Sequence, residues 1–221
     1  MSALGLFLQG DGVTRGVALL LLLMSVGSWV VILWKARLLY RAGRSVSRSI
    51  AAFWQSPSMT QAAERLSAFD ADALVLPLLQ ATHLSADGSL AAAGDRAQQL
   101  TRVLRAALQG VLARLQFGQV WLATVGSTAP FVGLLGTVWG IYHALLGMSD
   151  PGQLSIDRIA APVGEALVMT AAGLAVAIPA VLAYNVQGRA VARIEAELEG
   201  FARDLRDLLA GQVASQAVAS A

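Results

Sequence analysis

The 221-residue sequence contains no cysteine and only two histidines, His83 and His143, far apart in the chain. Without cysteine, a disulfide framework and a thiolate metal site are excluded, and two distant histidines do not predict a transition-metal site. No metal or other cofactor is therefore expected. Charged residues are scarce as well, at 14% of the chain against 56% hydrophobic residues. This balance predicts an all-α integral membrane protein with a modest soluble portion.

Three runs with few or no charges are long enough to cross about 30 Å of hydrocarbon. We expect transmembrane helices at residues 16–34, 119–147 and 159–187. The basic residues of the first run follow its apolar stretch rather than precede it, which favours a span over a secretory signal. The remaining segments are an N-terminal arm, a large helical segment, a short loop and a C-terminal tail, at residues 1–15, 35–118, 148–158 and 188–221.

The Lys and Arg residues are unevenly divided among these segments. Residues 35–116 carry ten and the tail carries four, whereas the arm and the short loop carry only Arg15 and Arg158. The positive-inside rule therefore predicts a cytoplasmic large segment, a cytoplasmic C-terminus and a periplasmic N-terminus. The basic cluster that begins at Lys35 is predicted to anchor this topology, and it can also meet anionic lipid headgroups. We do not infer nucleic-acid binding from it.

The large segment has the periodicity of helices. Ser58 followed by Gln61 forms a capping-box pattern, which predicts the start of a helix. Further along, apolar residues recur at three- and four-residue intervals from Leu100 to Leu115. Because no proline separates this stripe from the second span, we predict one helix over about 90–147, about 85 Å long.

The tail repeats this pattern. Apolar positions recur from Ile194 to Leu208, and opposite charges four residues apart, such as Arg203 and Asp207, favour a helix. We therefore predict that the third span continues as an amphipathic helix that packs on the long helix predicted over about 90–147.

Glycines recur regularly in the second span. Gly126, Gly133, Gly140 and Gly147 are separated by seven residues, and Gly136 forms a GxxxG pair with Gly140. Glycine lets helices approach closely where lipid removes the hydrophobic drive for association. The stripe predicts a packed helix face, which many transport proteins and scaffolds possess.

Two threonines are candidates for polar groups within the membrane. Thr137 follows Gly133 by one helical turn and shares its face. Thr137 and Thr170 lie equally far from the outer ends of their spans, about 15 Å by the helical rise, so we expect them at the same depth. The ordinary alternative for each is a hydroxyl bonded to its own helix.

Glu165 is the only charged residue in the stretch 159–188. A charged group at the centre of a span costs about 2.5–3.5 kcal/mol on insertion scales, so Glu165 is predicted to be functional. A carboxyl group that gains and loses a proton could carry protons through the membrane. The alternative is a structural pair with Arg158, two turns earlier on the same helical face. The spacing does not decide whether Glu165 and Thr170 line one cavity.

His143, near the outer end of the second span, is a candidate minor proton relay, with interfacial packing as the alternative. An intramembrane hydrolase needs a nucleophile with a base, or paired aspartates, and the spans offer neither. No enzyme activity is therefore expected. A passive scaffold whose glycines pack against neighbours is the other class of protein that these patterns allow.

The stretches GSTAPFVGLLGTVWGIYHAL at 126–145 and APVGEALVMTAAGLAVAIPAVLAYN at 161–185 resemble the ExbB/TolQ/MotA proton-channel family. The ExbB branch is the most similar and the TolQ branch the next. By motif position, the resemblance implies that Glu165 is the family's span-three glutamate and that Thr137 and Thr170 are its pathway threonines. The local PVGEALVMT differs slightly from the commoner PGIAEALIAT form.

The resemblance also implies a location and partners. It implies a homo-oligomer of five copies in the bacterial inner membrane, surrounding the helices of an ExbD-type single-span protein. Such a complex delivers proton-motive energy to a TonB-type protein for import across the outer membrane, for example of siderophores or cobalamin. A TolQ-like subunit of the Tol-Pal envelope system is the alternative within the family.

Overall fold

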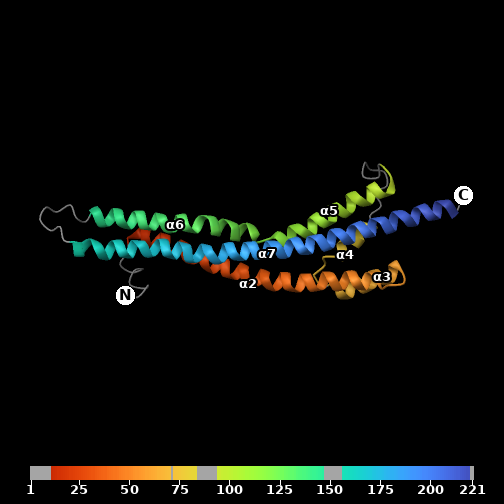
Figure 1. Ribbon diagram of the computed structural model, residues 1–221, viewed down its shortest axis with the longest axis horizontal. Coiled ribbons are helices and arrows are strands. Elements are labelled where there is room, and N and C mark those ends of the chain that lie inside the picture. The colour runs from red at the N-terminus through yellow and green to blue at the C-terminus, as the bar shows by residue number, and fades with distance from the viewer. Residues whose placement is uncertain (1–10, 71, 84–93, 147–155, 220–221) are drawn as a thin grey trace. The chain divides into compact units, whose positions relative to one another are not determined.

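The structure is a computed structural model that describes residues 11–70, 72–83, 94–146 and 156–219. All regular elements in these ranges are helices, which confirms the predicted all-α class (Figure 1). They are α2 (Gly12–Trp54), α3 (Met59–Phe69), α4 (Leu76–Ala81), α5 (Arg96–Gln116), α6 (Gln119–Leu146) and α7 (Ile156–Ala219). α2, α6 and α7 are each long and apolar enough to cross a membrane, as predicted.

The chain divides into two compact units. The first is formed by residues 1–35 and 118–186, so it contains the first part of α2, all of α6 and the first part of α7. The second is formed by residues 36–117 and 187–221, so it contains α3, α4, α5 and the remaining parts of α2 and α7. Each unit has its own hydrophobic core.

The first unit carries its large apolar side chains on the outside. Leu23, Phe131 and Leu182 are 60, 71 and 61% exposed. Its buried apolar core is small and is formed by residues of three helices: Val17, Leu21, Met24, Leu122, Val125, Ala129, Ala177 and Ala180. Such a surface suits hydrocarbon rather than water, because lipid removes the drive to bury apolar groups between helices.

The second unit has the core of a water-soluble helical domain. The predicted stripe from Leu100 to Leu115 is buried on α5, and α7 buries its own stripe from Ile194 to Leu205. Both stripes belong to one cluster with residues of α2, α3 and α4. The predicted packing of the tail helix on the long helix is therefore confirmed for the part of that range that α5 forms.

The predicted single helix over about 90–147 is wrong, because α5 and α6 are separate helices. Phe117 leaves the helical region with φ −52° and ψ 136°, and Gly118 has φ +83°. Positive φ is the left-handed region that glycine occupies without a steric penalty. A glycine just past the last helical turn is a common stop signal, which a search for proline alone overlooks.

Side-chain caps fix the beginnings of two helices in the second unit. The backbone N–H of Gln61 donates to Ser58 Oγ over 3.4 Å, which confirms the predicted start of α3. Asp95 does the same for α5, since its Oδ1 accepts from the Gln98 N–H over 2.7 Å. Each cap satisfies a backbone donor that has no partner within its helix.

The position of Lys35 in the structure contradicts the prediction that its side chain can meet lipid headgroups. It is fully buried, with 0% of its surface exposed. The arginines that follow it along α2, at positions 37, 41, 44 and 48, are exposed. Contact with lipid phosphates can therefore come from these arginines and not from the buried ammonium group.

A buried carboxylate organises the turn between α3 and α4. Asp70 is 5% exposed and accepts from the backbone N–H groups of Leu74, Val75 and Leu76 over 3.0, 2.8 and 2.7 Å. One ionised side chain thereby satisfies three amides at the start of a helix, and hydrogen bonds to an ionised acceptor are among the stronger ones in proteins.

We predict that Asp70→Ala destabilises the protein by about 1–3 kcal/mol, because it leaves buried amide donors without an acceptor. The measurement is the apparent Tm of the purified protein in mild detergent. Asp72→Ala is the matched control, because the Asp72 carboxylate makes no hydrogen bond among the described residues. Equal Tm values for the two variants would contradict a capping role for Asp70.

Candidate functional site

Within the first unit, α6 and α7 approach each other through a pair of glycines. A Cβ atom placed on Gly133 would lie 2.6 Å from the carbonyl oxygen of Met169. A Cβ atom on Gly173 would lie 2.6 Å from the carbonyl oxygen of Ala129. Both separations are far inside van der Waals contact, and the obstacle is backbone in each case. Only glycine at both positions allows this approach.

The other described glycines of the α6 stripe face the same way. A Cβ atom on Gly126, Gly136 or Gly140 would meet Val181, Met169 and Ala166 of α7 at 2.5, 3.0 and 2.8 Å respectively. The stripe is thus one continuous face packed on α7. Gly147 lies outside the described residues.

One turn from the glycine contact, two hydroxyl groups meet. Thr170 Oγ1 donates to Thr137 Oγ1 over 3.3 Å, and Thr137 Oγ1 donates to the carbonyl oxygen of Leu134 over 2.7 Å. Thr137 is 5% exposed and Thr170 is half-buried. A hydroxyl has one donor and two acceptor positions, so Thr137 can bond to its own helix and also accept from α7. The contact agrees with the equal depth expected for the two threonines.

Glu165 lies at the edge of this helix contact and is half-exposed. The next residue, Ala166, is buried, and so is Met169 one turn further on. Among the described residues, the Glu165 carboxylate has no hydrogen-bond or ion-pair partner, and the structure does not join it to either threonine. The side chain of Arg158 lies outside the described ones, so the alternative pairing of Arg158 with Glu165 stays a prediction.

The glycine contacts also give the register of α6 against α7. Gly140 lies against Ala166 and Gly136 against Met169, so the helices run antiparallel. Glu165 is then level with about residue 141 of α6, and Thr170 lies about 7 Å deeper by the helical rise. A carboxylate and a hydroxyl pair thus follow one another along the span. Such groups inside a membrane are typical of proton and ion pathways.

Three further hydroxyls on α6 were not singled out from the sequence. Thr124 and Thr128 are exposed and donate to their own helix, at the carbonyl oxygens of Val120 and Thr124, over 2.8 and 2.7 Å. Ser127 is also exposed and donates to the Thr124 carbonyl oxygen over 3.0 Å. Back-bonding makes these groups tolerable next to lipid while leaving acceptor lone pairs on the outer surface.

His143 belongs to a cluster at the other end of α6. Asp11 Oδ2 accepts from Trp139 Nε1 over 3.2 Å and lies 3.4 Å from His143 Nε2. Sequence reasoning identified His143 but missed both partners. Asp11 precedes α2 and shares no periodic pattern with α6, so no local signal could have joined the two.

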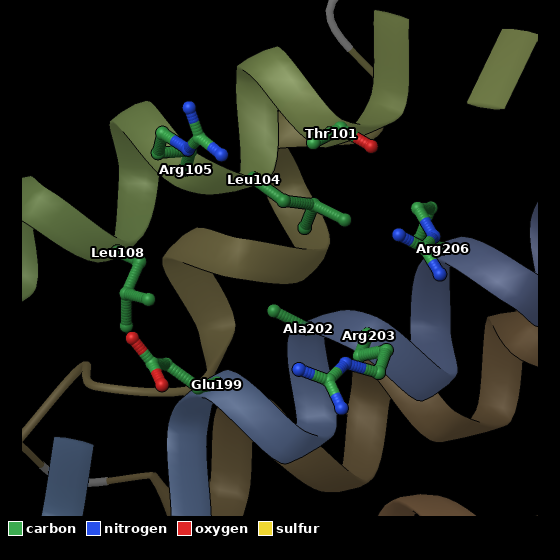
Figure 2. Close-up of a pocket in the computed structure, with 8 residues that line it drawn as sticks. All are labelled: Thr101, Leu104, Arg105, Leu108, Glu199, Ala202, Arg203 and Arg206. Carbon is green, nitrogen blue, oxygen red and sulfur yellow. The ribbon is translucent and has the colours of Figure 1, made fainter. Parts of the chain in front are cut away.

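A groove of about 210 Å³ lies between α5 and α7 in the second unit (Figure 2). It is lined by Thr101, Leu104, Arg105, Leu108, Glu199, Ala202, Arg203 and Arg206. Arg206 already holds Asp207, with Nη2 and Oδ1 2.6 Å apart, whereas the predicted pairing of Arg203 with Asp207 is not formed. Glu199 in the groove and Asp207 beside it offset the three arginine side chains that line it. The groove therefore does not have the charge of a strong anion site.

The chain was then compared with known proteins. Residues 72–200 match the family described as the MotA/TolQ/ExbB proton channel family. The chain is 40% identical over 211 residues to the biopolymer transport protein ExbB of Neisseria meningitidis, covering 93% of this chain and 96% of that protein. The chain belongs to the MotA/TolQ/ExbB proton channel family.

Two further relatives are an ExbB protein and a TolQ protein. The chain is 42% identical over 214 residues to the biopolymer transport protein ExbB of Xanthomonas campestris, covering 91% of this chain and 83% of that protein. It is 30% identical over 228 residues to the Tol-Pal system protein TolQ of Haemophilus influenzae, covering 98% of this chain and 97% of that protein.

The family match contains the whole hydroxyl and carboxylate site. Residues 72–200 include Thr137, Glu165 and Thr170 as well as the glycine contact, whereas Asp11 lies before the matched region. The family is one of proton channels, and polar or ionisable groups inside a membrane are typical of proton pathways.

We predict that Gly173→Ala destabilises the first unit by about 1–3 kcal/mol, because its Cβ meets backbone and forces α6 and α7 apart. The separation should also break the hydrogen bond between Thr170 and Thr137. The measurement is the apparent Tm of the detergent-solubilised protein. Gly164→Ala on the same helix is the matched control, because a Cβ there meets nothing within 4 Å. A Gly173→Ala protein as stable as the control would show that the close approach is not required.

Proposed function

We propose that this chain is the channel-forming subunit of a proton-driven complex in the bacterial inner membrane. In this proposal it works with an ExbD-type single-span partner and delivers energy to a TonB-type protein for transport across the outer membrane. Its support is the 40–42% identity to proteins named biopolymer transport protein ExbB, against 30% to a TolQ protein. A TolQ-like role in the Tol-Pal system is the second candidate, favoured by a similarity that covers 98% of the chain.

The single observation that carries the proposal is the hydrogen bond between Thr170 and Thr137 on helices that also present Glu165. In the proposed mechanism, Glu165 exchanges a proton with an acidic group of the partner helix through water. The two hydroxyls keep the deeper part of the path polar and hydrated. Each charge that crosses 100 mV supplies about 2.3 kcal/mol, which is enough to bias a conformational step.

The proposed assembly is a homo-oligomer of five copies around the partner helices, as the family resemblance implies. The half-exposed Glu165 supports an arrangement in which α7 faces a lumen or a partner rather than lipid alone. A carboxylate directed into hydrocarbon would be unfavourable, whereas a hydrated lumen or a polar partner would accommodate it.

The experiment that tests the proposal replaces Glu165. We expect Glu165→Gln to lower proton-motive-force-dependent ferric-siderophore uptake at least about tenfold, because an amide cannot titrate while keeping the size of the carboxyl group. The assay uses cells that lack their own complex and express this chain with its partners, and the yield of purified complex is measured in parallel. Glu165→Asp, which retains a titratable group, is the matched control and should keep part of the activity.

Normal uptake by Glu165→Gln at normal complex yield would mean that titration of Glu165 is not required. If the chain were a passive scaffold, Glu165→Gln would instead lower the yield of complex and the uptake together. A strain that lacks the Tol-Pal complex provides a second host. If the chain restores the function of the Tol-Pal complex in that strain but does not restore siderophore uptake, the TolQ-like role is favoured.

The threonines are tested by a pair of variants on α7. We expect Thr170→Val to lower uptake by about two- to tenfold, because it removes the hydroxyl that contacts Thr137 while preserving shape. Thr170→Ser keeps a hydroxyl and should retain most of the activity. Equal activity of the Val and Ser variants would show that the hydroxyl is not part of the path.

The proposed topology places the second unit in the cytoplasm and the 148–158 loop in the periplasm. Since the chain has no cysteine, Thr60→Cys and Gln153→Cys each introduce a unique label. An impermeant maleimide added to intact cells with a permeabilised outer membrane should label position 153 and not position 60. The reverse pattern would overturn this orientation.

A further inference from the structure

The contact between the start of α2 and the last turns of α6 gathers a histidine, a carboxylate and aromatic rings. Asp11 Oδ2 lies 3.4 Å from His143 Nε2 and accepts from Trp139 Nε1 over 3.2 Å. The His143 ring lies against two aromatic rings, at centroid distances of 4.8 Å from Trp139 and 5.6 Å from Tyr142. The imidazole is therefore oriented from several sides, yet its side chain remains 43% exposed.

The hydrogen bonds of Asp11 favour its ionised form. It accepts from the Gly12 backbone N–H over 2.7 Å, and this bond together with the Trp139 indole N–H holds the pKa of the carboxyl below its usual range. His143 and Arg15 add smaller effects in the same direction. The carboxylate is thus available to stabilise an imidazolium over the whole range in which imidazoles titrate, about pH 5 to 8.

The other titratable or charged groups of the first unit whose side chains are described are few: Arg15, Lys35, Tyr142, Glu165 and Tyr184. The α6–α7 register places His143 level with about residue 163 of α7, so Glu165 lies only about 3 Å deeper along the axis. Glu165 is half-exposed and can be reached through water. His143 therefore supplies the imidazole that lies above Glu165 at the smallest difference in depth along the spans.

We propose that His143 and Asp11 form the proton-loading group of the pathway, placed at its entrance above Glu165. This inference rests on the function proposed for the site and adds the step by which protons enter it. Asp11 at Nε2 favours the tautomer with hydrogen on Nε2, so Nδ1 is the position that exchanges protons. A hydronium ion transfers its proton to Nδ1, giving an imidazolium and water. The imidazolium then gives a proton through water to the Glu165 carboxylate, which leaves neutral imidazole and a neutral carboxyl group.

A loading group matters most when protons are scarce outside. His143→Gln should therefore leave uptake within about twofold of the parent protein near pH 5.5 and lower it about tenfold near pH 8, since only the imidazole collects protons efficiently there. The measurement is siderophore uptake by cells expressing the complete complex, normalised to the parent protein at each outer pH. Asp11→Asn should shift the profile in the same direction, and it provides a second test if His143→Gln lowers the yield of complex.

Two controls separate proton loading from mechanical bracing. Trp139→Phe removes one of the two hydrogen bonds that favour ionised Asp11 while keeping an aromatic ring beside His143, so it should shift the pH profile in the same direction as Asp11→Asn but by less. His83→Gln makes the same substitution at an exposed histidine of the second unit and should have no effect. An unchanged pH profile in both His143→Gln and Asp11→Asn would overturn the proposal. A loss that is equal at all pH values and shared by Trp139→Phe would also overturn it, because it would show a brace.

The failure of this proposal is distinguishable from failure of the pathway itself. If Glu165→Gln is inactive at every pH and His143→Gln has the parent profile, the pathway stands and the loading group does not. If Glu165→Gln is active, the pathway is wrong and the loading group is overturned with it, because Glu165 is the group that His143 is proposed to load.

Discussion

The close contact of Gly133 with Gly173 is the constraint on which the structure of the first unit depends. Threonine side chains are short, and two of them on different helices touch only if the backbones come very near each other. With glycine on both sides, Thr170 reaches Thr137 over 3.3 Å. The same contact fixes the register and therefore the depth of Glu165. Packing and polar chemistry are thus set by the same few atoms, because no larger side chain could be accommodated between the helices.

The two units of the chain solve the problem of burial in opposite ways. The second unit buries leucines and phenylalanines such as Phe53 and Phe201, whose rings meet edge to face at 5.1 Å, as a soluble domain does. The first unit has a smaller core, in which alanines and glycines of α6 and α7 pack beside a few larger residues such as Leu122, and it exposes Phe131 and similar residues. Few polar groups therefore lie between the helices of the first unit. The few that are present, above all Thr137, are therefore unusually informative about function.

The parts of the structure that could be predicted from sequence are those encoded in local spacing. The three apolar runs, the cap at Ser58 and the buried stripes each follow from residues within a few turns of one another. The helix end at Gly118 was also encoded locally, but its signal is a single glycine, which occurs within helices as well, and not a repeated side-chain pattern. The meeting of Trp139 with Asp11, 128 residues apart, and of the two threonines depends on how helices rotate and pair. Periodicity within one helix carries no information about that rotation.

The separation of α5 from α6 has a mechanical consequence. A continuous α-helix transmits torque because each turn is hydrogen-bonded to the next, and α7 runs as one helix of 64 residues, about 96 Å by the helical rise, although Pro179 supplies no backbone N–H to this ladder. At Phe117 and Gly118 the ladder is interrupted, so α6 can turn about its axis without twisting α5 to the same degree. The two helices that contribute a threonine to the site therefore differ: α6 begins just after a break in the backbone ladder at Phe117 and Gly118, whereas α7 passes Pro179 without ending.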